Sequence, residues 1–391
     1  MKLAFVAPFY GPDASGGAEA ECRQTALHLA KAGHDVEVWT TCARDLVHGW
    51  TFNWHPEGVS LDGPVTVRRF RVIPHALDAF SLLHEKLLRG ERLSAEEEAD
   101  FFAHFCNAPD LYRYIDGHAS DMDWLLFIPY LFGTTVYGSR LEPGKSILIP
   151  CLHDEAYART HAVAEVFSRC KRVVFHTQAE QKLAATLYPD TNGDGAHCIG
   201  EGVDQEFESD ANRFRDTFDI HQPFLLYAGR KDASKNVDWL VKAFVEYKKE
   251  DKEDLQLVCI GPGDLSVAGS SHPCIRDLGF VSLQEKYDAY DAAWLMCQPS
   301  LNESFSLVIM EAWSRGTPCL VHGDCPVTRE HAIRSGGGLY AASVREFAAC
   351  LETLRGEPEL ARAMGEAGKC YVRENFSWQR IVELYETQVL A

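Results

Sequence analysis

Residues 2–41 read KLAFVAPFYGPDASGGAEAECRQTALHLAKAGHDVEVWTT. This stretch begins and ends with apolar runs, Lys2–Pro8 and Asp35–Thr41, each of the length of a strand. Between them, Glu19–Ala32 carries apolar residues at helical spacing, and a glycine follows as a natural helix end. The order strand, helix, strand is typical of a parallel sheet covered by helices.

The same alternation continues along nearly the whole chain. Further strands are predicted at Val65–Val72, Trp124–Pro129, Ser146–Cys151, Arg172–Phe175, Phe224–Ala228, Gln256–Ile260, Asp277–Phe280, Trp294–Pro299 and Pro318–His322. Further helices are predicted at Val237–Lys249, Leu283–Ala292, Phe305–Arg315, Val344–Arg355, Glu359–Glu374 and Trp378–Leu390. The sequence therefore predicts an α/β protein with two doubly wound domains.

Two segments depart from this alternation. Residues 77–115 form a charged, helical insertion in the first half, whose acidic run Glu96–Glu98 is expected to be a solvated face. Around Ile199–Phe207, glycines and acidic residues replace the hydrophobic pattern. We therefore expect an N-terminal domain at 1–204, a C-terminal domain at 205–375, and a last helix at 376–391 for which packing on the first domain is one possibility.

The composition and charge of the chain indicate which kinds of binding partner are disfavoured. The chain has 391 residues, of which 46% are hydrophobic and 24% charged, and its formal charge is -19. Because both halves are acidic, the sequence disfavours binding to nucleic acid through a broad basic face. The basic group at residues 68–71 is interpreted as a solvated strand edge rather than a membrane contact. The longest apolar stretch, Trp124–Gly133, is about half the ~20 residues of a membrane helix.

The cysteines indicate the compartment. There are 13, an odd number, without a CxxC pair, and several lie inside apolar runs. They favour a reducing cytoplasm over a disulfide framework.

Candidate ligand loops follow the predicted strands, because open parallel sheets bind ligands at the carboxyl ends of their strands. Gly16 and Gly17 precede a helix, where backbone N–H groups can approach an anion; an ordinary tight turn is the alternative. The GxGxxG dinucleotide fingerprint is missing, which disfavours an NAD-dependent oxidoreductase. Arg230 and Lys235 lie in a loop before a helix, where two cations suit a pyrophosphate unless they are merely solvated.

The densest signal is PSLNESFSLVIMEAWSRGTP, residues 299–318. A helix is expected to begin at Ser304 or Phe305, so that the free N–H groups of residues 304–307 can hold an anion. Glu303 can accept hydrogen bonds from sugar hydroxyls. Glu311 suits a ribose, or is only a salt-bridge partner.

His153 follows the predicted strand Ser146–Cys151 in the segment PCLHDEAY. Three interpretations remain open for it: a substrate contact, a metal ligand, or a histidine tied to its acidic neighbours. No second His or Cys stands at ligand spacing, which ranks the metal lowest.

Together these residues resemble the family 4 glycosyltransferases of the GT-B fold. The match includes Gly16-Gly17, His153, Glu201-Gly202-Val203-Asp204, Gly229-Arg230 with Lys235, Gly261 and Gly263, Glu303 to Glu311, Gly316-Thr317-Pro318 and Phe376-Ser377-Trp378. The resemblance implies two Rossmann-like domains facing across a cleft, the first binding the acceptor and the second a nucleotide-sugar donor.

The resemblance also implies a role for each matched position. Arg230 and Lys235 would neutralise the donor diphosphate, while Glu303 would contact hydroxyls of the donor sugar. His153 would lie beside the reacting sugar. The remaining donor contacts would come from Gly16, Gly17, Gly261, Ser304, Phe305, Ser306, Leu307 and, at the ribose, Glu311.

The implied reaction is transfer of a hexose-type sugar with retention of configuration, in cell-surface polysaccharide or other glycan synthesis. Retention can proceed through a covalent intermediate or by front-face attack, and front-face attack is favoured because the sequence offers no compelling nucleophile. No cofactor and no essential metal are expected. The acceptor would be a glycan, a lipid-linked compound or a small molecule, and the protein would be cytoplasmic with at most transient contact with the inner face of the membrane. The resemblance leaves the oligomeric state, the donor base and the donor sugar open.

Two positions depart from the family pattern. Ser306 stands where glycine is usual, and Glu201 where asparagine is common. Ser306 motivates an alternative function, a catalytically silent nucleotide-sugar-binding or scaffolding protein of the same fold.

Overall fold

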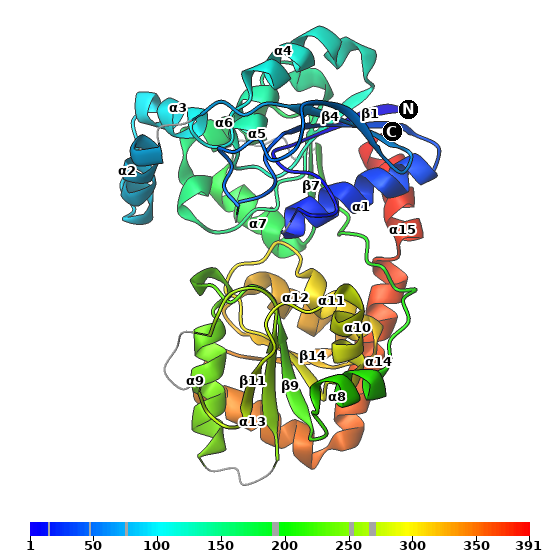
Figure 1. Ribbon diagram of the computed structural model, residues 1–391. Coiled ribbons are helices and arrows are strands. Elements are labelled where there is room, and N and C mark those ends of the chain that lie inside the picture. Colours follow the sequence, from blue (N-terminus) through cyan, green and yellow to red (C-terminus); the bar gives the residue numbers. More distant parts are fainter. Residues whose placement is uncertain (15, 47, 75–76, 190–194, 250–253, 266–270) are drawn as a thin grey trace. The chain divides into compact units, whose positions relative to one another are not determined.

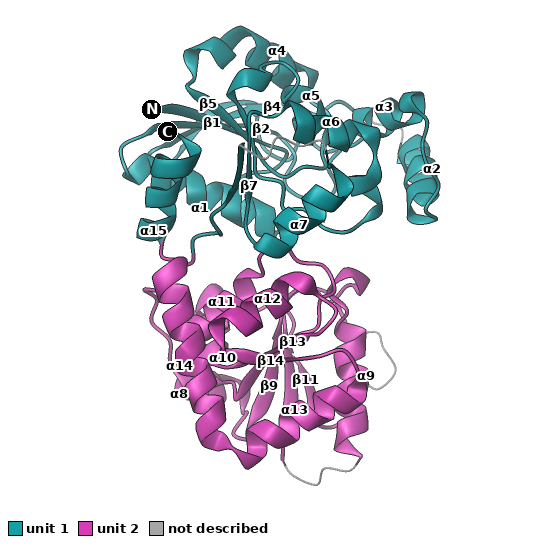
Figure 2. Cartoon of the chain, turned by 180° about the vertical axis from the view of Figure 1, so that it is seen from behind, with its two compact units in different colours: residues 1–202, 378–391 teal, residues 203–377 magenta. Residues whose placement is uncertain are grey.

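The computed structural model describes the chain except residues 15, 47, 75–76, 190–194, 250–253 and 266–270 (Figure 1). It contains two compact units, coloured separately in Figure 2. Unit 1 comprises residues 1–202 and 378–391, and unit 2 comprises residues 203–377. The divisions thus fall two residues away from the expected boundaries, and the last helix is part of unit 1.

Unit 1 is built around an eight-stranded sheet. Its strands are β1 (Lys2–Ala7), β2 (Asp35–Thr41), β3 (Gly58–Asp62), β4 (Val65–Phe70), β5 (Trp124–Phe127), β6 (Ser146–Leu148), β7 (Arg172–Phe175) and β8 (Ala196–Cys198). Their order is β3-β4-β2-β1-β5-β6-β7-β8, and every pairing is parallel except that of β3 with β4.

The helices of unit 1 include the expected one after β1. They are α1 (Gly17–Lys31), α2 (Leu77–Leu88), α3 (Ala95–Ala103), α4 (Pro109–His118), α5 (Gly133–Gly138), α6 (His161–Arg169), α7 (Gln178–Leu187) and α15 (Trp378–Leu384), followed by a π-helical turn, η6 (Tyr385–Val389). Helix α15 packs beside α1, far from it in sequence (Figure 1).

Unit 2 has a six-stranded parallel sheet. Its strands are β9 (Phe224–Ala228), β10 (Gln256–Ile260), β11 (Ile275–Asp277), β12 (Leu295–Gln298), β13 (Cys319–His322) and β14 (Gly338–Ala341), in the order β11-β10-β9-β12-β13-β14. Its helices are α8 (Ala211–Phe218), α9 (Val237–Lys248), α10 (Leu283–Ala292), α11 (Leu307–Ser314), α12 (Pro326–Ser335), α13 (Val344–Gly356) and α14 (Pro358–Asn375). Helices α9 and α13 pack together, as do α10 and α11.

In both sheets, the order in which the chain adds strands reverses at the first strand of the unit. In unit 2 the chain moves from β9 outward to β11 on one side and from β12 to β14 on the other, and in unit 1 it divides in the same way between β1 and β5. Such a reversal places the loops after the two central strands beside each other, at the edge where doubly wound proteins bind ligands.

The alternation pattern located most elements but missed three strands, β3, β8 and β14, and the helices α5, α6, α7, α8 and α12. Strand β3 has Val59 57% and Leu61 73% exposed, so it lacks the buried face on which the prediction depends. Strands β8 and β14 are short, and most of their residues are partly exposed, so neither presents a buried apolar run. The bounds of several predicted strands also differ, most of all those of β6, which ends at Leu148 instead of Cys151, and of β11, which covers Ile275–Asp277 instead of Asp277–Phe280.

The insertion is helical, as expected, but it is not simply a solvated outcrop. Helices α2, α3 and α4 supply much of the apolar core of unit 1, with buried residues that include Phe80, Leu83, Phe101, Phe102, Leu111 and Ile115. The acidic run is also not uniformly solvated, because Glu98 is buried and accepts hydrogen bonds from the backbone of His161 and Ala162 at 2.9 Å each. That carboxylate holds the start of α6, a long-range role that local composition does not reveal.

Candidate functional site

The carboxyl ends of β9 and β12 bring together two groups predicted separately. Lys235 lies in the loop after β9 and Glu303 in the loop after β12, and the Lys235 Nζ is 2.7 Å from the Glu303 Oε1. The two side chains are 23% and 10% exposed, so the pair is mostly buried. The Asn236 side chain also donates to the Pro299 carbonyl at 3.0 Å, which ties the two loops together. The reversal of strand order is the reason that residues 68 positions apart meet here.

Arg230 has a different partner from Lys235. Its Nε lies 3.3 Å from the Asp232 Oδ2, and its side chain is 43% exposed. Burial opposes ionisation of Asp232, but the hydrogen bond from Ser234 and the charge of Arg230 outweigh it and lower the pKa of that carboxyl. The Tyr227 hydroxyl donates to the Arg230 carbonyl and fixes the backbone at this point.

Helix α11 begins later than expected, at Leu307 rather than Ser304 or Phe305. The residue before it, Ser306, has φ 78°, in the left-handed region where glycine is favoured. The N–H groups free of helical partners therefore begin at Leu307, not at Ser304. Phe305 is buried, with its ring edge-to-face with those of His331 and Phe376, so its side chain belongs to the core.

Gln298 was not singled out by the sequence. It is the last residue of β12 and is buried, and its Nε2 donates to the Glu303 Oε1 at 3.4 Å and to the Ser306 Oγ at 3.3 Å. A glutamine at a strand end gives no signal of its own. Its contacts join the predicted sugar-binding carboxylate to the residue that departs from the family pattern.

Glu311 forms the salt bridge that was its alternative interpretation. Its Oε1 is 2.8 Å from the Lys286 Nζ, and its Oε2 accepts a hydrogen bond of 2.8 Å from the Tyr290 hydroxyl. Burial and the charge of Glu311 raise the pKa of Tyr290 well above its usual range, so the phenol stays protonated and donates. Each carboxylate oxygen retains a lone pair with which it could accept a further hydrogen bond.

The loops after β9 and β10 approach closely at Gly261. A Cβ at this position would overlap the carbonyl of Gly229, and its φ of 119° is one that side chains rarely adopt. Lys231, which follows Arg230 in the sequence and has no distinguishing signal there, is buried here. Its Nζ donates to the Gly261 and Gly263 carbonyls at 2.6 and 3.2 Å and pairs with the Asp277 Oδ1 at 2.7 Å.

In unit 1, Gly16 is the residue before α1, with φ 152°, and a Cβ there would overlap the Glu19 carboxylate. Gly17 has open space at its Cβ position. The neighbouring Ser15 lies outside the described residues. Gly16 thus precedes the helix, as expected, whereas Gly17 is its first residue.

His153 lies five residues beyond the end of β6, because that strand stops at Leu148. Its Nδ1 is 3.9 Å from the Glu155 Oε1, a long contact, while Glu155 accepts a hydrogen bond of 2.7 Å from the Tyr130 hydroxyl. Asp154 pairs with Arg159. Among the described residues, the one group with the geometry to hold a metal ion is Glu21, Cys151 and His176, and it does not include His153.

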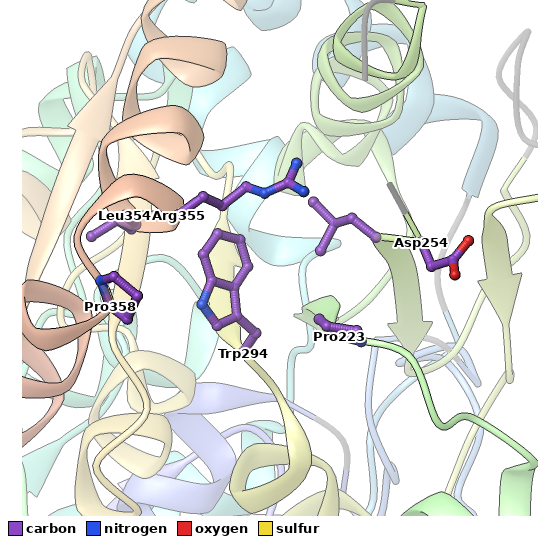
Figure 3. A pocket seen from close by; sticks show the side chains of 7 residues that line it. Pro223, Asp254, Trp294, Leu354, Arg355 and Pro358 are labelled. Atoms are coloured by element: carbon purple, nitrogen blue, oxygen red, sulfur yellow. The ribbon is translucent and has the colours of Figure 1, made fainter. Parts of the chain in front are cut away.

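A separate pocket of about 510 Å³ lies at the other end of the unit 2 strands (Figure 3). It is lined by Pro223, Asp254, Leu255, Trp294, Leu354, Arg355 and Pro358. Pro223, Leu255 and Trp294 directly precede β9, β10 and β12, so the pocket is at the amino ends of these strands. None of the predicted site residues lines it.

Comparisons with known proteins agree with this architecture. Residues 222–356 match the family model described as Glycosyl transferases group 1. A D-inositol 3-phosphate glycosyltransferase of Saccharomonospora viridis is 26% identical over 95% of this chain and 88% of its own.

Two solved structures resemble the chain over its whole length. Sucrose-phosphate synthase from Thermosynechococcus elongatus aligns with a TM-score of 0.74 at 17% identity, covering 99% of each chain. Anabaena HepE, solved in complex with UDP and glucose, aligns with a TM-score of 0.71 at 16% identity, covering 100% of this chain and 99% of its own. The expected GT-B fold is confirmed.

Proposed function

We propose that this chain, a glycosyltransferase of the GT-B fold, moves a hexose-type sugar from a nucleoside-diphosphate sugar to an acceptor hydroxyl with retention of configuration. The single observation that carries the proposal is the Lys235–Glu303 pair at the β9/β12 reversal, with Arg230 in the same loop as Lys235. Cations and a carboxylate held together at this edge suit a ligand that carries both a diphosphate and sugar hydroxyls.

In the proposed reaction, the bond between the anomeric carbon and the diphosphate oxygen breaks as the acceptor oxygen attacks from the same face. The departing phosphate oxygen takes the proton of the acceptor hydroxyl. Arg230 and Lys235 stabilise the negative charge that grows on the diphosphate, which is usually the largest single contribution to such catalysis. No divalent metal takes part in this scheme.

Glu303 binds hydroxyls of the donor sugar in this scheme, and Gln298 holds its Oε1 in place. Glu311 accepts from the ribose while keeping its bonds to Lys286 and Tyr290. Backbone N–H groups at the start of α11, from Leu307 onward, face the phosphate. The remaining roles, His153 beside the reacting sugar and Gly16 and Gly17 at the diphosphate, rest on the family resemblance.

The first experiment is a thermal-shift panel of UDP, GDP and ADP and their common sugar conjugates, with EDTA present. A ligand that binds only the folded protein must raise the unfolding temperature. UDP and UDP-glucose are the first to test, because HepE was solved with UDP and glucose. We expect one nucleoside diphosphate to raise the unfolding temperature in the presence of EDTA.

A matched pair of variants checks the site. Lys235→Ala should abolish the shift, whereas Lys249→Ala, which removes an exposed lysine paired with Glu246, should retain it. A shift without any transfer or donor hydrolysis would favour the alternative, a nucleotide-sugar-binding or scaffolding protein. Equal shifts in both variants would contradict the placement of the donor.

We further propose that the enzyme works in the cytoplasm, with transient membrane contact at most, in polysaccharide or other glycan synthesis. All 13 cysteines are free thiols, as a reducing compartment requires. In the part of the chain that the structure describes, no helix has both the length and the apolar character to cross a membrane.

A further inference from the structure

Three buried charged side chains form a cluster next to the loop that carries His153. Glu21 comes from α1, His176 directly follows β7, and Glu180 comes from α7, and their side chains are at most 4% exposed. The His176 Nε2 is 2.5 Å from the Glu21 Oε1, and its Nδ1 is 3.4 Å from the Glu180 Oε2. The imidazole therefore lies between two carboxylates.

The charge state of His176 follows from these neighbours. Burial by itself would lower the pKa of His176, but the charges of Glu21 and Glu180 and their hydrogen bonds outweigh it and raise the pKa well above its usual range. The other titratable groups facing the cluster are Cys22, Cys151, Glu201 and Tyr385. Burial raises the pKa of both thiols and of the phenol, so they stay neutral and His176 is the cation of the cluster.

The same two carboxylates hold the loop before His153. The Glu180 Oε1 accepts the N–H of Leu152, and its Oε2 accepts the N–H of His176, each at 2.7 Å. The Cys151 thiol donates to the Glu21 Oε2 at 3.3 Å. Two successive residues, Cys151 and Leu152, are thus held from two different helices.

The backbone at Cys151 needs this support. Its φ is 51°, in the left-handed region that is unfavourable for a residue with a side chain. Such conformations persist where the surrounding contacts enforce them, and they occur often at functional sites. Here the contacts on both sides of the Cys151 backbone set the direction in which the chain continues to His153.

We propose that Glu21, His176 and Glu180 are positioning residues that orient His153 for the transfer reaction. Glu21 lies four residues after Gly17 on α1, so the cluster also couples the start of that helix to the His153 loop. The inference rests on the proposed function, because His153 takes its role from it.

A metal ion is the competing explanation, since Glu21, Cys151 and His176 have ligand atoms within 4.8 Å of one another. Two ligands that each lie 2.0–2.1 Å from a tetrahedral zinc are about 3.3 Å apart. The 2.5 Å between the Glu21 Oε1 and the His176 Nε2 is shorter than that separation and lies within hydrogen-bond distance. The Glu21–His176 ion pair accounts for this distance. The metal content of the purified protein is measured as part of the test.

The test compares two buried carboxylates that each accept two backbone N–H bonds. Glu180→Gln removes one acceptor below the His153 loop, and Glu98→Gln does the same at the start of α6. We expect Glu180→Gln to speed amide hydrogen exchange of residues 152–155 at least tenfold, and Glu98→Gln to act instead at residues 161–162. His176→Gln should speed amide exchange of residues 152–155 to the same extent as Glu180→Gln.

The kinetic arm separates positioning from stability. We expect Glu180→Gln to lower kcat at least tenfold while the donor KM stays within twofold, and Glu98→Gln to leave both within twofold. Unchanged exchange of residues 152–155 in both Glu180→Gln and His176→Gln would overturn the proposal. So would equal losses of kcat in Glu180→Gln and Glu98→Gln.

Metal analysis completes the test. Stoichiometric zinc in the purified protein, lost on Cys151→Ala, would replace the ion pair by a metal site and overturn the proposal; its absence supports the ion pair. If the unsubstituted protein neither binds nor turns over any nucleotide sugar, the proposed function fails. The amide exchange then still decides whether the cluster holds the loop.

Discussion

At the scale of single residues, the site depends on a few side chains that the fold pairs. For Lys235, the ordinary alternative was a solvated surface base. Its contact of 2.7 Å with Glu303, in a pair with little exposure, removes that interpretation.

Replacing Lys235 by alanine removes one of the two cations proposed for the leaving diphosphate. We expect kcat/KM for transfer to fall about 10²- to 10³-fold, the usual effect of deleting one group that stabilises a developing charge. Steady-state kinetics with the donor found in the thermal-shift panel measures it. Activity within threefold of the unsubstituted enzyme would remove Lys235 from the site.

Ser306 combines a strained backbone with a useful hydrogen bond. Ser306→Ala keeps the left-handed φ of 78° and loses the bond from Gln298, so we expect a loss of about 1 kcal/mol in the free energy of unfolding. Ser306→Gly loses the same bond but relieves the strain, so it should be more stable than the alanine variant by about 1 kcal/mol. Urea denaturation of both variants checks the order, and an alanine variant as stable as the glycine one would contradict it.

His176 should make stability depend on pH in a defined direction. Its pKa is raised in the folded protein, against about 6.5 in the unfolded chain. The contribution of His176 to the free energy of unfolding is therefore fully present below about pH 6.5 and is lost as the pH rises through the folded-state pKa. We expect the difference in unfolding free energy between the unsubstituted protein and His176→Gln to shrink with rising pH in that window. A difference that grows with pH would contradict the assignment of the imidazolium.

At the scale of elements, the ends of β9 and β10 must come close together for their loops to form. Gly261 leaves no room for a Cβ beside Gly229, and Lys231 holds the carbonyls of this loop against Asp277. The glycine is therefore required by the packing of two loops as well as by its own φ.

Gly261→Ala tests this close approach. We expect a loss of about 3 kcal/mol in the free energy of unfolding, combining overlap with a backbone that alanine rarely adopts. Gly336→Ala is the matched control, because it has φ 61° but open space around it, and it should cost only about 1 kcal/mol. Equal losses in the two variants would show that overlap at Gly261 contributes nothing.

At the scale of the whole molecule, the chain passes twice between the units, at residues 202–203 and 377–378. The returning segment buries Ile381, Tyr385, Val389 and Leu390 in unit 1. Arg172 on β7 also donates to the carbonyls of Val389 and Ala391. The C-terminus is thus part of the first unit's structure.

Truncation after Ser377 should therefore destabilise unit 1. Each buried side chain is worth about 1.5–3 kcal/mol, which for four predicts a drop of at least 10 °C in the unfolding temperature of that unit. Unit 2, residues 203–377, has its own sheet and core, and we expect it to unfold cooperatively when expressed alone. Differential scanning calorimetry of the two fragments and the full chain measures both, and an unchanged transition in the truncated chain would contradict the first expectation.

The alternating apolar runs determined the doubly wound architecture, because a strand buried on both faces, such as β9, is predominantly apolar. The glycines and charged residues that follow those strands indicated the candidate ligand loops, because parallel sheets bind ligands at the carboxyl ends of their strands. Tertiary structure alone decided which of these residues meet. Lys235 contacts Glu303 because β9 and β12 are neighbours in the sheet. Glu98 is buried against the start of α6. Glu21, His176 and Glu180 come from three different parts of unit 1 and form one cluster. Sequence periodicity reports which face of an element is apolar, whereas pairing between side chains depends on strand order and long-range packing.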